Sequence, residues 1–164
     1  MIEYVHNSEV DMKCAIGQDS HRFSTTADKP LILAGVLIED HIPFDANSDG
    51  DVIYHALVNA ISGITSVNIL GSVTDRMCAS GITDSKYYVT EALKYMENEI
   101  THVSFSIEGS TPKLAPYIQT MKENVAKLLD IKIKDVGMTA TSGEGLTAFG
   151  KGEGIFCTCL LTVI

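Results

Sequence analysis

The sequence of 164 residues has no apolar run that reaches the 18 or so residues needed to cross a bilayer. It also lacks the pattern of a secretory signal, because its opening stretch MIEYVHNSEVDMK is polar and acidic. We therefore expect a cytoplasmic protein. We further expect residues 1–12 to form a flexible extension and residues 13–164 to form a single domain.

Positive charge is scarce in this sequence. Twelve Lys and Arg residues stand against 21 Asp and Glu residues, which gives a net charge of −9. The phosphate backbone of nucleic acids and anionic membranes should repel such a chain, so we expect neither as a partner. A phosphorylated ligand would have to be held locally, by a metal ion, backbone N–H groups and a few placed cations.

The four cysteines form no CxxC motif. Cys157 and Cys159 alternate in the stretch GIFCTCLLTVI, so their side chains should point to the same side of a strand. A buried free cysteine packs as a small hydrophobic residue, and we expect that role in preference to a metal or redox role. We expect no disulfide framework.

The spacing of apolar residues changes several times along the chain, which indicates alternating strands and helices of an α/β or α+β protein. The predicted strands cover residues 13–17, 31–37, 102–108, 134–141 and 155–164, and the predicted helices cover residues 49–64, 85–99 and 114 or 116 to 129. Ser48 is the predicted N-cap of the first helix, and Gly63 fits its end. Residues 68–82 and the glycine-rich residues 142–154 are predicted loops. The last strand is almost wholly apolar, which predicts burial on both faces, with copies of the chain as one possible cover.

A candidate metal site is spread over two segments. Asp19 and His21 are two residues apart after a strand-like stretch, so their side chains should converge. His55 lies in the predicted helix. Two nitrogen ligands and one oxygen ligand suit tetrahedral zinc with an open fourth position, which could polarise a phosphoryl oxygen. Each residue alone also fits an ordinary surface position, and the sequence does not show that the two segments meet.

Three further motifs have a functional and a plain reading. Hydroxyls and N–H groups in residues 141–144 and 150–154 could cradle phosphate, with Glu144 binding magnesium and Lys151 acting as a point charge, or the segment could be a solvated hairpin. Residues 110–116 could form a rigid loop that reads a base edge, or a plain connection. Residues 47–51 could cap a helix, contact phosphate at its N-terminus, or do both.

Five strings in one register, GQDSHRF, NSDGDVIYHAL, TPKLAP, TATSGEGL and GKGEG, resemble the 2-C-methyl-D-erythritol 2,4-cyclodiphosphate synthase family. The resemblance implies an α+β fold (an α/β sandwich) with a mixed four-stranded sheet and helices on one face. It also implies a homotrimer, with sheets packed around a three-fold axis and active sites between subunits. The implied activity belongs to the non-mevalonate isoprenoid pathway. It is a phosphorus–oxygen lyase reaction that cyclises 4-diphosphocytidyl-2-C-methyl-D-erythritol 2-phosphate and releases CMP.

The resemblance also assigns roles to residues. It implies zinc at Asp19, His21 and His55, Mg²⁺ or Mn²⁺ at Glu144 with the substrate diphosphate, and a cytosine-binding loop at residues 109–115. The catalytic residues implied are Asn47 and Ser142. The substrate-binding residues implied are Asp19, Ser20, His21, Asn47, Ser48, Gly71, Asp75, Gly109, Pro112, Lys113, Leu114, Ala115, Thr141, Ser142, Gly143, Glu144 and Lys151.

The chain departs from the family pattern at four places, of which Ser142, where Thr is commoner, is a mild one. Asn47 stands where the family usually has His, and it can donate a hydrogen bond but carries no charge. Lys151 stands where Arg is usual, and residues 68–82 differ from the family's loop, with Asp75 as the candidate acid there. Two alternatives therefore stay open: a metal-dependent phosphohydrolase with the same fold, and a non-catalytic trimer that binds isoprenoid diphosphates along its axis.

Overall fold

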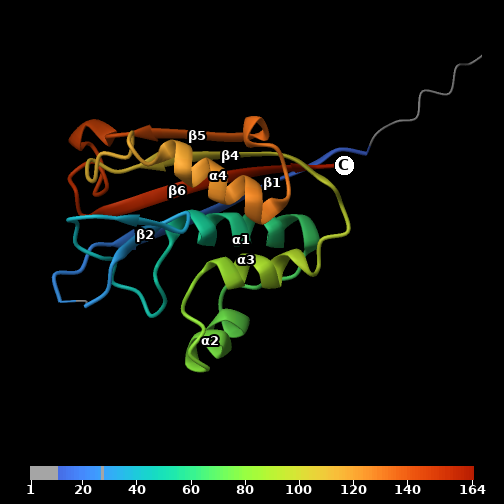
Figure 1. The fold of residues 1–164 in the computed structure, drawn as a ribbon, viewed down its shortest axis with the longest axis horizontal. Helices are drawn as coiled ribbons and strands as arrows, with labels where there is room; N and C mark the ends of the chain where they lie inside the picture. The colour runs from blue at the N-terminus through green and yellow to red at the C-terminus, as the bar shows by residue number, and fades with distance from the viewer. Residues whose placement is uncertain (1–10, 27) are drawn as a thin grey trace, which may run out of the picture.

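The computed structural model describes residues 11–26 and 28–164, so most of the predicted extension at residues 1–12 lies outside the described residues. Four strands form one sheet in the order β1-β6-β4-β5 (Figure 1). They are β1 (Lys13–Arg22), β6 (Gly154–Val163), β4 (Ile100–Glu108) and β5 (Val136–Thr141). The β4–β5 pair is parallel and the other two pairs are antiparallel, which confirms the predicted mixed sheet.

Helices cover one face of this sheet (Figure 1). Helix α1 (Val52–Thr65) packs on β1 and β6, α4 (Ile118–Leu129) packs on β5, and α3 (Lys86–Leu93) packs on α1. A short hairpin of β2 (Leu31–Leu33) and β3 (Val36–Ile38) touches α1 through β2. Within the described residues, no helix combines the length and the apolar character that a membrane crossing requires. The cytoplasmic location stays a prediction.

Helix α1 lies unusually close to β1 because small residues line the contact. A Cβ added at Gly17 would sit 2.0 Å from the carbonyl oxygen of Ala56 and 2.3 Å from the backbone nitrogen of Ala60. Farther along the helix, a Cβ at Gly63 would lie 2.9 Å from that of Ala15. A strand and a helix can approach this closely only where a side chain is missing. The contact places the segment after Gly17 directly beside the first turns of α1.

Asp51, and not the predicted Ser48, is the N-cap of α1. Its carboxylate accepts hydrogen bonds from the backbone N–H groups of Ile53 and Tyr54, both at 3.2 Å. Ser48 instead accepts a bond from the N–H of Gly50 at 3.1 Å, in the turn that precedes the helix. The pattern of Ser followed three residues later by Asp marked the right region, but the deeper carboxylate takes the capping position.

The reason for the deeper cap is that Asp51 also holds the β2–β3 turn. Its two carboxylate oxygens accept bonds from the N–H groups of Ala34, at 2.9 Å, and Gly35, at 2.7 Å. Burial and the neighbouring Asp49 raise the pKa of Asp51 to about 7, while the backbone N–H groups act in the opposite direction. A fully buried carboxylate needs this many donors, and it thereby fastens the hairpin to the helix.

Several predicted boundaries were wrong. Residues 68–82 are not a plain loop, since they contain α2 (Ser72–Ala79). The predicted strand 31–37 is the β2–β3 hairpin, the helix predicted over 85–99 ends at Leu93, and α1 continues past Gly63 to Thr65. The missed helix α2 is only eight residues long and has a single buried residue, Thr74, while its half-buried Val73 and Met77 pack against the core. Two apolar positions make too short a stripe for a sequence pattern to reveal the helix.

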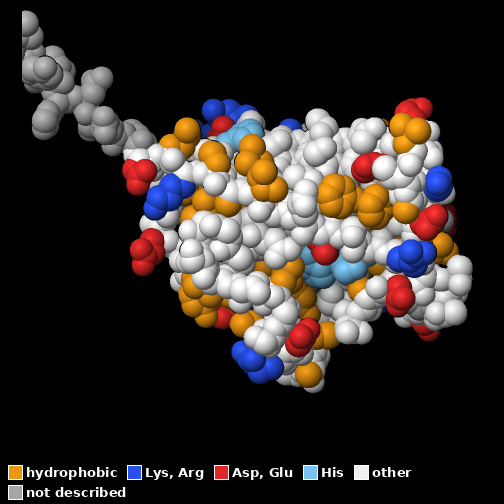
Figure 2. All heavy atoms as spheres, turned by 180° about the vertical axis from the view of Figure 1, so that it is seen from behind, with side chains coloured by type: hydrophobic (Ala, Val, Ile, Leu, Met, Phe, Trp, Pro, Cys, Tyr) orange, Lys and Arg blue, Asp and Glu red, His pale blue; other side chains and the backbone are white. Residues whose placement is uncertain are grey.

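The sheet face away from the helices is open in the single chain. The residues at odd positions of β6, from Ile155 to Val163, are buried, but on the other face Leu160 is 40% exposed. Its neighbour on β1, Ile16, is 64% exposed. On the face seen from behind, Lys and Arg lie around the margin, while the middle shows hydrophobic patches and, between them, histidine atoms beside an acidic atom (Figure 2). The sequence predicted burial of β6 on both faces, and within a single chain only the face toward the helices is buried.

We predict that Gly17→Ala destabilises the protein, because the new methyl group has no room unless α1 moves away from β1. Overpacking of this kind costs about 1–3 kcal/mol. The free energy of unfolding can be measured by denaturation in urea, with Gln18→Ala as the control because Gln18 is adjacent and exposed. Equal stability of Gly17→Ala and the wild type would contradict a tight contact.

Candidate functional site

The three predicted metal ligands meet at one point. Asp19 and His21 lie on β1, and His55 lies in the first turn of α1. The Oδ2 atom of Asp19 is 3.0 Å from Nε2 of His21 and 3.0 Å from Nδ1 of His55. The two ring nitrogens are 3.1 Å apart. The sequence could not bring residues 19 and 55 together, and the close contact of β1 with α1 does so.

The donor set fits a zinc ion. Bond lengths of about 2.0–2.1 Å to nitrogen and oxygen place neighbouring ligand atoms about 3.3 Å apart in a tetrahedron. The separations of 3.0–3.1 Å between the three ligand atoms need an expansion of only a few tenths of an ångström to reach this value. Three ligand atoms leave the fourth position for water or substrate. Ser20, between the two strand ligands, points to the opposite and exposed side of β1.

The carboxylate of Asp19 is ionised at neutral pH. Burial by itself raises the pKa of Asp19, but hydrogen bonds and charge interactions with His21 and His55 outweigh it and lower the pKa to about 2. Because a metal ligand must be deprotonated, Asp19 can bind a cation at neutral pH without first losing a proton.

A cavity of about 280 Å³, which we call the metal cavity, lies beside the metal ligands. Its lining residues come from β1, α1, α2, α3 and the segment before α1, and they are His21, Ala46, Asn47, Ser48, His55, Leu70, Thr74, Asp75, Cys78 and Tyr88. Asn47, Ser48 and Asp75, all proposed from the sequence, thus lie with the metal ligands. Gly71 is the N-cap of α2 and donates its N–H to the hydroxyl of Thr74 at 3.1 Å. It lies next to this cavity in sequence but is not one of its lining residues among those described.

A second cavity, of about 320 Å³, joins two motifs that are 30 residues apart in sequence. Its lining residues are Gly109, Pro112, Lys113, Leu114, Ala115, Ile118, Met138, Ala140, Thr141 and Ser142. The loop after β4 and the end of β5 form it, because these two strands are parallel neighbours whose carboxyl ends coincide. We call it the base cavity, after the cytosine-binding role that the sequence resemblance implies for its loop.

The glycine-rich loop is folded onto the end of β4. The hydroxyl of Thr147 donates to the carboxylate of Glu108 and accepts a bond from the N–H of Gly150 at 3.0 Å. The Ser142 hydroxyl donates to Glu144 at 2.7 Å. Glu144 and Lys151 are both exposed, and among the described residues neither joins the Asp19 group of potential metal ligands. A metal ion at Glu144 would therefore need further oxygen ligands from a bound phosphate, and Lys151 would contact that phosphate directly.

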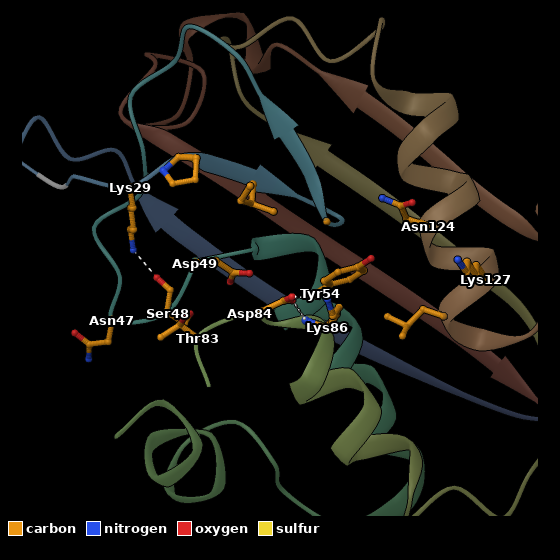
Figure 3. A pocket seen from close by; sticks show the side chains of 14 residues that line it. Lys29, Asn47, Ser48, Asp49, Tyr54, Thr83, Asp84, Lys86, Asn124 and Lys127 are labelled. Atoms are coloured by element: carbon orange, nitrogen blue, oxygen red, sulfur yellow. Dashed lines mark hydrogen bonds and ion pairs between the residues drawn. The ribbon is translucent and has the colours of Figure 1, made fainter. Parts of the chain in front are cut away.

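A third cavity, of about 890 Å³, shares Asn47 and Ser48 with the metal cavity. Figure 3 shows Lys29, Asn47 and Ser48 on one side of it and Asn124 and Lys127 on the other. The Lys29 ammonium group donates to the carbonyl oxygens of Ala46 and Ser48, both at 2.5 Å. Lys29, which the sequence motifs did not single out, thus fixes the segment on both sides of Asn47.

Behind the metal ligands lies a contact that no sequence motif indicated. The Nε2 atom of His55 is 2.9 Å from the hydroxyl oxygen of Ser85, which is fully buried at the start of α3. The Ser85 hydroxyl donates to the carboxylate of Asp49. The signal available in the sequence was weak, since Asp49 belonged to a motif read as a helix cap and Ser85 only marked a helix start.

Comparison with known proteins finds relatives that match nearly the whole chain. A chain of Chlamydia caviae named 2-C-methyl-D-erythritol 2,4-cyclodiphosphate synthase is 50% identical over 155 residues, which cover 92% of this chain and 88% of that one. The bifunctional IspDF of Campylobacter jejuni superposes with a TM-score of 0.84 at 28% identity. The match covers 93% of this chain and 42% of that longer chain.

A third relative is the 2C-methyl-D-erythritol 2,4-cyclodiphosphate synthase of Plasmodium vivax, with a TM-score of 0.78 at 25% identity over 93% of this chain and 97% of that one. The sheet order and the cluster of two histidines and one aspartate define an α+β protein with a group of ligand atoms that could hold a metal ion. The model of the YgbB family matches residues 12–164, and the chain belongs to that family.

We predict that Asp19→Asn and His55→Ala each weaken zinc binding at least about tenfold, because each removes a direct ligand. Competition with a chromophoric chelator measures the affinity. Asp75→Asn is the matched control, since Asp75 lines the same cavity without belonging to the ligand group. Wild-type affinity in both ligand variants would rule out zinc at this position.

Proposed function

We propose that this chain is a 2-C-methyl-D-erythritol 2,4-cyclodiphosphate synthase of the non-mevalonate isoprenoid pathway. It converts 4-diphosphocytidyl-2-C-methyl-D-erythritol 2-phosphate into the 2,4-cyclodiphosphate and CMP. The main support is an intact site of Asp19, His21 and His55 in a chain that is 50% identical to a relative with this name.

The reaction is an intramolecular phosphoryl transfer. An oxygen of the 2-phosphate forms a bond to the β-phosphorus, and the bond from that phosphorus to the oxygen of CMP breaks. No protein nucleophile is required, so the task of the chain is to fold the substrate for in-line attack and to neutralise charge. Zinc at the three ligands would neutralise phosphate charge and polarise a phosphoryl oxygen.

Residues around the metal cavity would hold the rest of the erythritol phosphate. Ser48 and the backbone near it offer hydrogen bonds beside the metal ligands, and Asp75 offers a carboxylate for a hydroxyl group of the sugar alcohol. Asn47 would donate its amide hydrogens to the transferred phosphate without adding charge. The Lys29 ammonium group keeps this segment in place through the carbonyl groups on both sides of Asn47.

The base cavity would bind the cytidine end of the substrate. Residues 109–115 offer backbone N–H and C=O groups to the cytosine edge, and Lys113 offers a cation. Thr141 and Ser142 lie at the mouth of the glycine-rich loop and would contact the diphosphate. Glu144 would bind Mg²⁺ or Mn²⁺ together with diphosphate oxygens, and Lys151 would add a point charge.

A homotrimer with active sites between subunits would unite the two cavities. Two of the three metal ligands belong to β1 at one edge of the sheet, and the base cavity lies at the end of β5 at the other edge. We propose that the base cavity of one subunit faces the metal site of its neighbour. The exposed Ile16 and Leu160 on the open sheet face support packing against further copies of the chain.

We predict that the pure protein with zinc and magnesium converts the cytidylyl substrate into equimolar CMP and cyclic diphosphate. Phosphorus NMR measures both products. The two alternatives give different results. A phosphohydrolase would release a linear phosphate product, and a non-catalytic diphosphate-binding trimer would leave the substrate unchanged. The complete set of three ligand atoms at the metal site argues against lost catalysis, and the names of the relatives favour the synthase.

We predict that two inactive variants restore activity when co-expressed. One carries Asp19→Asn, and the other carries Lys113→Ala and Ser142→Ala in the base cavity. Random mixing in a trimer leaves about a quarter of the shared sites with both halves intact. Each variant expressed alone serves as the control, and ultracentrifugation gives the assembly size. No recovery in verified mixed trimers would show that each site lies within one chain.

A further inference from the structure

We propose that Asp49 and Ser85 are positioning residues that fix the tautomer of His55, so that its Nδ1 atom faces the metal with a free electron pair. The proposal rests on the metal assignment above and not on the reaction. It concerns hydrogen bonds on the far side of the ligand ring, and neither residue is among the described residues that line the cavity beside the metal ligands.

The argument starts from the hydroxyl of Ser85. Serine at the start of a helix normally caps it, because its oxygen accepts a bond from a backbone N–H of the first turn. Ser85 is the N-cap of α3 but makes no such side-chain bond. Its side chain is instead fully buried and lies between His55 and Asp49. A buried hydroxyl withdrawn from helix capping has another structural task.

The direction of each hydrogen bond follows from the number of protons. The Asp49 carboxylate has acceptors only, and it takes both the hydroxyl proton and the backbone N–H of Ser85, the latter at 2.9 Å. A hydroxyl has one proton, so toward Nε2 of His55, 2.9 Å away, the Ser85 oxygen can only accept. Nε2 must therefore carry a hydrogen.

The consequence appears at the other ring nitrogen. Before a cation binds, Nδ1 lies 3.0 Å from Oδ2 of Asp19, where a hydrogen can bridge the two atoms, and 3.1 Å from Nε2 of His21. A cation that displaces this hydrogen leaves a neutral imidazole with its hydrogen on Nε2 and its electron pair on Nδ1. The electron pair thus points to the place where a cation would sit. Hydrogen bonds behind a ligating histidine select its tautomer and orientation in this way.

Further hydrogen bonds hold Asp49 in place, so it can anchor the row of hydrogen bonds that leads through Ser85 to His55. Its Oδ1 atom also accepts the N–H of Asp51 at 3.1 Å, and its own N–H donates to the carbonyl oxygen of Thr83 at 2.9 Å. Asp49 lies on the segment that leads into α1, near Ser48 and Asp84 (Figure 3). The anchor is therefore built into the two segments that precede α1 and α3.

The sharpest test is Asp49→Asn, which keeps the shape of the side chain but exchanges donor and acceptor in the hydrogen bonds from residue 49 through Ser85 to His55. The asparagine oxygen would accept the Ser85 N–H, and its NH₂ group would donate to the Ser85 oxygen. The hydroxyl proton would then turn toward Nε2 of His55 and move the imidazole hydrogen to Nδ1. Ser85→Ala removes the acceptor altogether and serves as the second variant.

We expect both variants to bind zinc about 10–100-fold more weakly than the wild type, the usual loss for an outer hydrogen-bond partner of a metal ligand. Nitrogen-15 NMR of labelled histidines should show Nε2–H on His55 in the wild type and a shift toward Nδ1–H in Asp49→Asn. A merely structural role would lower the melting temperature without moving the tautomer. Asp84→Asn is the matched control, because Asp84 precedes Ser85 but pairs with the half-exposed Lys86.

Wild-type zinc affinity in both variants, or the absence of a hydrogen on Nε2 of His55 in the wild type, would overturn the proposal. If Asp49→Asn does not fold, Ser85→Ala with the same two measurements decides. Because the readouts are zinc affinity and tautomer, a protein that fails to form the cyclic product can still bear out this proposal, and the reverse also holds.

Discussion

The absence of a side chain at Gly17 sets the distance between β1 and α1, and the metal site depends on that distance. The strand supplies Asp19 and His21, and the helix supplies His55 from its first turn. A side chain at Gly17 would collide with the backbone of Ala56 and Ala60 and push the helix away from the strand. Because that side chain is missing, the three ligand atoms can lie within 3.1 Å of one another. Packing and ligand geometry are in this sense a single property of the fold.

The segment between the hairpin and α1 shows how two acidic side chains can lie close together in a buried region. Asp51 takes N–H groups from the β2–β3 turn and from the helix, and Asp49 takes the N–H and hydroxyl of Ser85. Each carboxylate thus has its own set of donors, which offsets the cost of burial. These bonds fasten the hairpin, α1 and α3 to one another before any ion is bound.

Local patterns in the sequence were sufficient where chemistry and spacing coincide. The two-residue spacing of Asp19 and His21 on a strand gave the correct shared side, and the alternation in β6 correctly predicted that Cys157 and Cys159 are buried. What the sequence could not give depends on contacts between distant segments. The cap at Asp51 is chosen by the Ala34 and Gly35 N–H groups, and the role of Ser85 is chosen by Asp49, 36 residues away. Helix α2 was missed because it is short and only Val73 and Met77 of its apolar side chains pack against the core.

The four free thiols divide cleanly by location. Cys157 and Cys159 lie fully buried under the helices, and burial raises the pKa of both thiols, which keeps them protonated and unreactive. Cys14 is exposed next to Thr162 of β6, and Cys78 lines the metal cavity. The folded protein therefore carries two natural attachment points for thiol reagents, one on the open sheet and one beside the metal ligands. A fluorophore or spin label on each would report separately on assembly and on ligand entry, with no engineered cysteine needed.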